Sequence, residues 1–167
     1  MSDAEFRLTL PDVDCLDEAQ RAVHDAIAGG PRGRVRGPTQ VWLHSPELAD
    51  RARKVGEYLR WEAGLDPRLR ELVILVTARH FDCDYIWFNH RTVAADAGLA
   101  EDVIAAIEHR RTPDLTDEDE AAVFAFATEL LTTNRVSDAA LRAVVERFGE
   151  RGAVDLLFQP IRERDVV

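Results

Sequence analysis

Three side chains near the middle of the chain, Glu71, Cys83 and His90, are of types that transfer protons or act as nucleophiles. Glu71 directly precedes the apolar run LVILV, where an unpaired carboxylate would be costly to bury. It must therefore be paired, protonated or functional, and an ion pair with Arg68, Arg70 or another arginine is the structural alternative. A carboxylate that faces a histidine would provide general acid–base chemistry.

Cys83 and His90 lie seven residues apart in the segment HFDCDYIWFNH, which places them two turns apart on one helix face. The start of a helix favours the thiolate form of a cysteine, although the flanking Asp82 and Asp84 oppose it. A lone cysteine also occurs often as a small core residue. His90 has an apolar face beside it, and this setting suits proton transfer near neutral pH.

The aromatic residues Tyr85 and Trp87 could form one wall of a pocket, or they could simply pack in the core. A metal site in this region would use four side chains with ligand chemistry: His80, Asp82, Cys83 and His90. Their spacing matches no paired-ligand helical motif, and no further cysteine or histidine pair completes a site. We therefore expect no metal.

Helices with clear start signals would position these residues. Ser45-Pro46 and Asp66-Pro67 are typical of helix starts, and the run LVILVTA indicates a central, buried helix. No segment alternates between apolar and polar residues as strands do, so the sequence predicts an all-α fold. The predicted helices cover residues 14–28, 46–63, 68–80, 82–98, 100–110, 116–132 and 137–148, with a last apolar piece at 154–158.

Length and charge restrict the class of protein. A chain of 167 residues can bury a real core, and we predict a single domain over residues 1–167. The net charge of −10 opposes binding to nucleic acid or to an anionic membrane.

No apolar run could cross a bilayer and the N-terminus lacks signal-peptide features, so a cytoplasmic protein is predicted. Cys15 and Cys83 are expected to be free thiols.

The densest basic cluster lies in a loop rich in glycine and proline, GGPRGRVRGPTQ. Such a loop is either a solvated connector or an arginine-bearing segment that folds over an anionic ligand. The cluster consists of Arg32, Arg34 and Arg36.

The stretch from Arg68 to Gly98 resembles the carboxymuconolactone decarboxylase family, which includes the alkylhydroperoxidase D proteins. The shared pattern is a glutamate in an RxRE-type helix, then Cys-x-Tyr-x-Trp-x-x-His, then an alanine-rich turn to Gly-Leu. Similarity extends from about residue 37 to about residue 158, which defines the core of the predicted domain. A helix over about 14–28 precedes this core, and an atypical C-terminal segment, 159–167, follows it. The residues that carry the pattern are Glu71, Cys83, Tyr85, Trp87, His90 and Gly98-Leu99.

The resemblance implies an all-helical, alkylhydroperoxidase D-like fold that assembles as homotrimers or hexamers, with a pocket near a subunit interface. In the redox branch of the family, a Cys-x-x-Cys-x-x-x-His motif and an upstream glutamate reduce peroxides. Glu71, Cys83 and His90 occupy three of these positions, but Ile86 replaces the second cysteine. Thiol–disulfide cycling would therefore lack its resolving partner, and the Tyr-x-Trp-x-x-His form looks more like the decarboxylase side.

The leading hypothesis is a cofactor-independent lyase or isomerase that acts on a small cyclic or unsaturated carboxylic acid. His90 would deliver a proton, Glu71 would orient it, and Cys83 would line the pocket. Tyr85 and Trp87 would shape the pocket. An arginine would bind the substrate's carboxylate, and the candidates are Arg70, Arg79 and the loop 32–36.

Two other hypotheses remain open, a thiol-dependent antioxidant reductase and a non-catalytic ligand-binding oligomer. Family members usually continue after a GERGAVDLL-like segment into a further apolar helix. This chain has FQPIRERDVV instead, in which Pro160 is expected to break the helix. The altered segment favours binding without turnover, if the usual helix covers the pocket or an interface.

Overall fold

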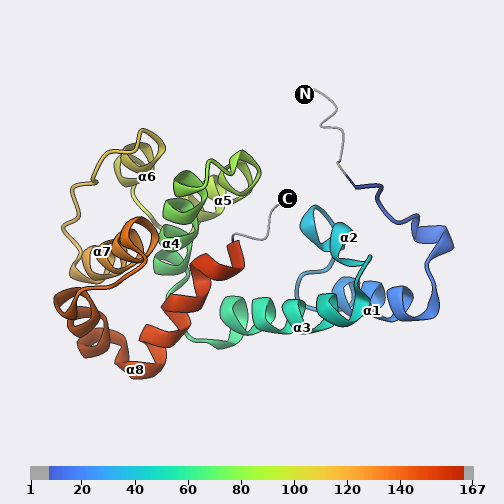
Figure 1. The fold of residues 1–167 in the computed structure, drawn as a ribbon. Coiled ribbons are helices and arrows are strands. Elements are labelled where there is room, and N and C mark those ends of the chain that lie inside the picture. Colours follow the sequence, from blue (N-terminus) through green and yellow to red (C-terminus); the bar gives the residue numbers. More distant parts are fainter. Residues whose placement is uncertain (1–7, 164–167) are drawn as a thin grey trace. The chain divides into compact units, whose positions relative to one another are not determined.

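The computed structural model describes residues 8–163, and side chains as far as residue 160. These residues form eight α-helices and no strand, as Figure 1 shows, so the predicted all-α fold is confirmed. None of the helices within this range combines the length and the hydropathy that a bilayer-spanning segment needs.

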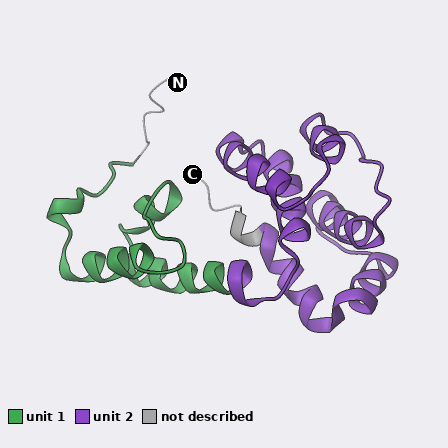
Figure 2. Ribbon diagram, turned by 180° about the vertical axis from the view of Figure 1, so that it is seen from behind, with its two compact units in different colours: residues 1–58, 167 green, residues 59–166 purple. Residues whose placement is uncertain are grey.

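The chain divides into two compact units, one that runs to Tyr58 and one that begins at Leu59 (Figure 2). The first unit contains a 3-10 turn, Val13–Cys15, and the helices α1 (Glu18–Ala28), α2 (Pro38–Trp42) and α3 (Pro46–Glu57). Its small core consists of four buried side chains: Val23, Ile27, Leu43 and Ala49. The division does not test whether residues 1–167 fold as a single domain, which stays a prediction.

Two expectations about the first unit were wrong in detail. The helix predicted from residue 14 begins at Glu18, because the Asp17 carboxylate caps it by accepting the N–H of Gln20 at 2.8 Å. The predicted arginine-rich loop also contains α2, a helix of five residues that starts at Pro38. Gly37 precedes it with a φ of +57°, a backbone conformation that glycine adopts without strain.

The second unit is built around α4 (Pro67–His80), which begins where the Asp66-Pro67 signal predicts. Every residue of α4 from 71 to 78 is buried, because this helix packs against four others. The predicted central helix is therefore confirmed. The unit starts in a short π-helical segment, Tyr58–Glu62, and the helices that surround α4 are α5 (Asp84–Asp96), α6 (Glu101–Glu108), α7 (Glu118–Thr133) and α8 (Asp138–Glu163).

The last helix corrects the expectation that Pro160 ends the helical structure. Helix α8 bends at Gly149, where φ is 72° and ψ is 174°, and then continues past Pro160 to Glu163. Only glycine adopts this backbone conformation readily, so the predicted break after residue 148 is found there as a bend. Pro160 has no N–H to donate to the preceding turn, yet the helix continues for three more residues. Gln159, 1% exposed, donates to the backbone oxygen of Leu59 at 3.4 Å.

Candidate functional site

A hydrogen bond between Glu71 and His90 joins the two central helices of the second unit. The Nδ1 atom of His90 on α5 lies 2.6 Å from the Oε2 atom of Glu71 on α4. Glu71 is completely buried and His90 is 8% exposed. Because an ionised carboxylate only accepts hydrogen bonds, Nδ1 carries the proton of this bond. The structure thus brings together two of the three reactive residues that the sequence singles out.

Two arginines surround the other oxygen of the Glu71 carboxylate. The Nε atom of Arg70 donates to Oε1 at 3.3 Å, and Nη2 of Arg60 lies 3.8 Å from the same oxygen. Arg70 also donates from Nη1 to the backbone oxygen of Arg60 at 2.7 Å, which fixes both residues. The predicted ion pair with Arg70 is therefore present. Arg68 instead pairs with Asp117 and Glu120.

The environment of Glu71 favours its ionised form. Burial by itself would raise the pKa of this carboxyl group, because it penalises the charged state. The hydrogen bond and the charge of His90, together with the charges of Arg60 and Arg70, outweigh burial and hold the pKa of Glu71 below its ordinary value. Glu71 is therefore a carboxylate at neutral pH, although it is fully enclosed.

This lowered pKa predicts how stability depends on acid. The stabilising effect of an ionised Glu71 is fully present above the pKa that it has in the unfolded chain, about 4.3. The effect is lost as the pH falls through the lower folded-state pKa. We expect the difference in unfolding free energy between the wild type and Glu71→Gln to be constant just above about pH 5 and to shrink below it. Urea denaturation of both proteins in acidic buffers measures this difference, and a difference that grows on acidification would contradict the assignment.

The second ring nitrogen of His90 is available for chemistry. Nε2 makes no hydrogen bond to any residue in the part of the chain that the structure describes. The exposed fraction of His90, 8%, leaves a small part of the residue in contact with solvent. A histidine with one nitrogen held by a carboxylate and the other unengaged can accept or donate a proton at the second nitrogen.

Cys83 lies at the N-cap of α5, immediately before the first helical residue. Its half-buried side chain packs against the main hydrophobic cluster of the second unit, and its thiol is free. No hydrogen bond joins it to Glu71 or His90 within residues 8–163. Ile86, at the position of the missing second cysteine, is buried in the same cluster. Cys15 belongs to the first unit.

The two aromatic residues of the motif lie in different environments. Tyr85 is 42% exposed, whereas Trp87 is 8% exposed. The guanidinium of Arg79 lies over the Trp87 ring, 4.7 Å from its centroid, and Nη2 of Arg79 pairs with Asp84 at 3.2 Å. Arg79 therefore contacts the motif helix through Trp87 and Asp84.

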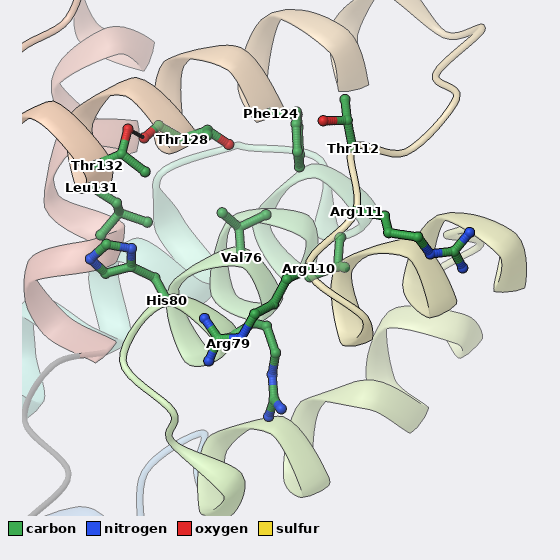
Figure 3. A pocket seen from close by; sticks show the side chains of 11 residues that line it. Val76, Arg79, His80, Arg110, Arg111, Thr112, Phe124, Thr128, Leu131 and Thr132 are labelled. Atoms are coloured by element: carbon green, nitrogen blue, oxygen red, sulfur yellow. Dashed lines mark hydrogen bonds between the residues drawn. The ribbon is translucent and has the colours of Figure 1, made fainter.

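Arg79 also lines a cavity of about 190 Å³ between α4, α6 and α7, as the close view in Figure 3 shows. Glu71, Cys83 and His90 do not line it. The structure thus separates the predicted site residues into a buried acid–base pair and an arginine-lined cavity. No group of three or more histidine, cysteine or acidic residues in the described part of the chain is arranged to hold a metal ion.

Sequence reasoning missed two polar residues of the second unit, the half-buried Arg60 and the buried Gln159. Arg60 approaches Glu71 across the turn that contains Gly64, and no periodic pattern links the two positions. Gln159 had no local signal either, since it contacts a residue one hundred positions earlier.

Residues 46–129, half of the chain, match the model of the carboxymuconolactone decarboxylase family. The chain therefore belongs to this family, as the resemblance of its central motif predicted. Membership supports a function of the carboxymuconolactone decarboxylase or alkylhydroperoxidase kind. A comparison with curated proteins gave no match.

Proposed function

We propose that the protein is a cofactor-independent decarboxylase-like lyase, or a related isomerase, that acts on a small cyclic or unsaturated carboxylic acid. The observation that carries this proposal is the 2.6 Å contact between His90 Nδ1 and the buried, ionised Glu71. Membership of the carboxymuconolactone decarboxylase family is compatible with this reaction and with that of the alkylhydroperoxidases.

The proposed step breaks the bond between the substrate's carboxylate carbon and the neighbouring ring carbon. Carbon dioxide leaves, and the electron pair passes into the adjacent lactone or carbonyl group as a dienolate. The protonated ring of His90 then donates its Nε2 proton to carbon, and the neutral imidazole takes another proton from water. Atoms and electrons balance without an external oxidant or reductant.

Glu71 is a positioning residue in this scheme. Its Oε2 atom accepts from Nδ1, which directs Nε2 away from the carboxylate, and its negative charge offsets the charge of the doubly protonated ring. Arg70 and Arg60 hold the Oε1 atom. The Nε and Nη1 donors of Arg70 are engaged with Glu71 and with the Arg60 backbone, so Arg70 fits a positioning role better than substrate binding.

The remaining motif residues would shape the substrate pocket. Cys83 is half-buried beside the core and would line the pocket, and Tyr85 and Trp87 would bound it. Arg79 faces a cavity that Glu71 and His90 do not line, so the proposed proton transfer does not use it.

Turnover of carboxymuconolactone and of related unsaturated lactone and cyclic carboxylates tests the proposal. Carbon dioxide release is followed in H₂O and in D₂O, and the product is examined by NMR. We expect one deuterium at one carbon of the dienolate, on one face only, because His90 delivers it from a fixed position. No release with any of these acids, or deuterium on both faces in equal amounts, would contradict the proposal.

A thiol reductase is the second candidate, and the place of Cys83 at the start of α5 is the observation that favours it. Its test is oxidation of the wild type and of Cys83→Ser by hydrogen peroxide, with mass spectrometry after dithiol treatment. Fast oxidation of Cys83 that dithiols reverse would favour the reductase. An inert thiol would leave the His90 mechanism as the better account.

A further inference from the structure

The cavity between α4, α6 and α7 has the features of a second binding site, away from the Glu71–His90 pair. Figure 3 shows Arg79 and Arg110 on one side of it and residues of α7 on the other, with Val76 between them. Its volume of about 190 Å³ is below the roughly 300–1,000 Å³ of pockets for drug-sized ligands, so any occupant is small.

Two residues that line this cavity each carry a buried polar atom without a hydrogen-bond partner. These atoms are Nε of Arg79 and Oγ1 of Thr128, and in the part of the chain that the structure describes they are the two buried side-chain atoms in this condition. A buried donor or hydroxyl that stays unpaired destabilises the protein, because its desolvation is not compensated. The two residues come from different helices, α4 and α7, and both line the cavity.

The charge of the cavity favours an anion. Arg79, Arg110 and Arg111 line it in a chain whose acidic residues outnumber its basic ones by 31 to 21. Asp84 pairs with Arg79 and Asp82 pairs with Arg110, which reduces their net field. Arg111 has no ion pair within residues 8–163, so its positive charge is uncompensated there.

The rest of the lining favours an apolar body on the ligand. Val76 and Ile107 contribute aliphatic surface, and Phe124 and Leu131 contribute more from α7. Thr132 lines the cavity too, but its hydroxyl already donates to the backbone oxygen of Thr128 at 2.7 Å. A bare phosphate would leave this apolar surface uncovered, whereas an apolar ring or chain with one carboxylate would cover it.

We propose that this cavity binds a small monocarboxylate with an apolar body, at a site distinct from the acid–base pair. One carboxylate oxygen accepts the Nε proton of Arg79, and the hydroxyl of Thr128 donates to the carboxylate. Arg111 lines the cavity but directs its guanidinium away from it in Figure 3, so it contributes positive charge at longer range, and Phe124 contacts the apolar body.

Calorimetric titration of the full chain with benzoate, and with benzamide as its neutral analogue, tests this site. We expect saturable benzoate binding and benzamide binding that is weaker by about tenfold, because charge-assisted hydrogen bonds to the carboxylate are lost. Thr128→Val, which keeps the side-chain shape, and Arg111→Gln, at an exposed position, are each expected to weaken benzoate binding by about three- to tenfold.

The control is Arg91→Gln, which removes another exposed arginine of the same unit, one that pairs with Glu101 and lies outside the cavity. It should bind benzoate as the wild type does. Equal binding of benzoate and benzamide would overturn the proposal, as would equal weakening by Arg91→Gln and Arg111→Gln. Loss of benzoate binding in His90→Gln, with unchanged binding in Thr128→Val, would assign the carboxylate to the acid–base pair instead.

Discussion

Replacement of His90 by glutamine is expected to lower kcat for decarboxylation by about 10²- to 10⁴-fold, the usual contribution of a positioned acid or base. Glutamine can still donate one hydrogen bond to Glu71, so the helices stay joined, but it cannot supply a proton to carbon. The rate of carbon dioxide release at saturating substrate measures the change. Circular dichroism on the same sample verifies the helical fold.

The matched control is His109→Gln, because His109 is exposed and lies outside the acid–base pair and the cavity. Its kcat should equal that of the wild type. An unchanged kcat in His90→Gln would contradict the assignment of His90. A parallel loss of activity and helicity would instead show that the residue acts on the fold.

Replacement of Glu71 by glutamine is expected to lower the free energy of unfolding at pH 7 by about 3 kcal/mol, as when one member of a buried ion pair is removed. The change leaves Arg60 and Arg70 facing a neutral amide, whose single oxygen can accept from His90 or from Arg70 but cannot replace both carboxylate oxygens. Chemical denaturation of the two proteins gives this difference. A loss below about 1 kcal/mol would show that burial offsets the attraction.

A surface glutamate provides the control for this second prediction. Glu101→Gln removes an ion pair with Arg91 that lies in solvent, and its effect should stay within about 0.5 kcal/mol. The double variant of Glu71→Gln and His90→Gln measures the coupling of the pair. Because the two residues are in contact, we expect the two losses of stability to be less than additive.

The parts of the fold that local physics determines could be predicted from the sequence. The dipeptide Asp66-Pro67 predicted the start of α4, and the run of apolar residues after Glu71 predicted that this helix is central and buried. The motif placed His90 on the next helix, and the pairing of Glu71 with an arginine followed from the cost of burying its charge.

The remaining features depend on contacts between residues far apart in the chain. Arg60 reaches Glu71 only because the turn before α4 folds back, and Gln159 contacts Leu59 through the packing of α8. The local sequence signal at Pro160 predicted a helix end, but α8 continues past it, next to Gln159 and its contact with Leu59. The cavity beside Arg79 combines three helices, and no single segment indicates it.

The burial of Glu71 ties the evolution of the site to the stability of the protein. The carboxylate lies in a helix whose residues 71–78 are all enclosed, and its partners on α5 and in the segment before α4 hold these elements together. A descendant that lost its substrate would still unfold more easily if it lost this glutamate. Selection for folding alone would therefore preserve the Glu71–His90 pair after catalysis had ceased. Inactive proteins of such a lineage would still contain both residues of the proposed acid–base pair.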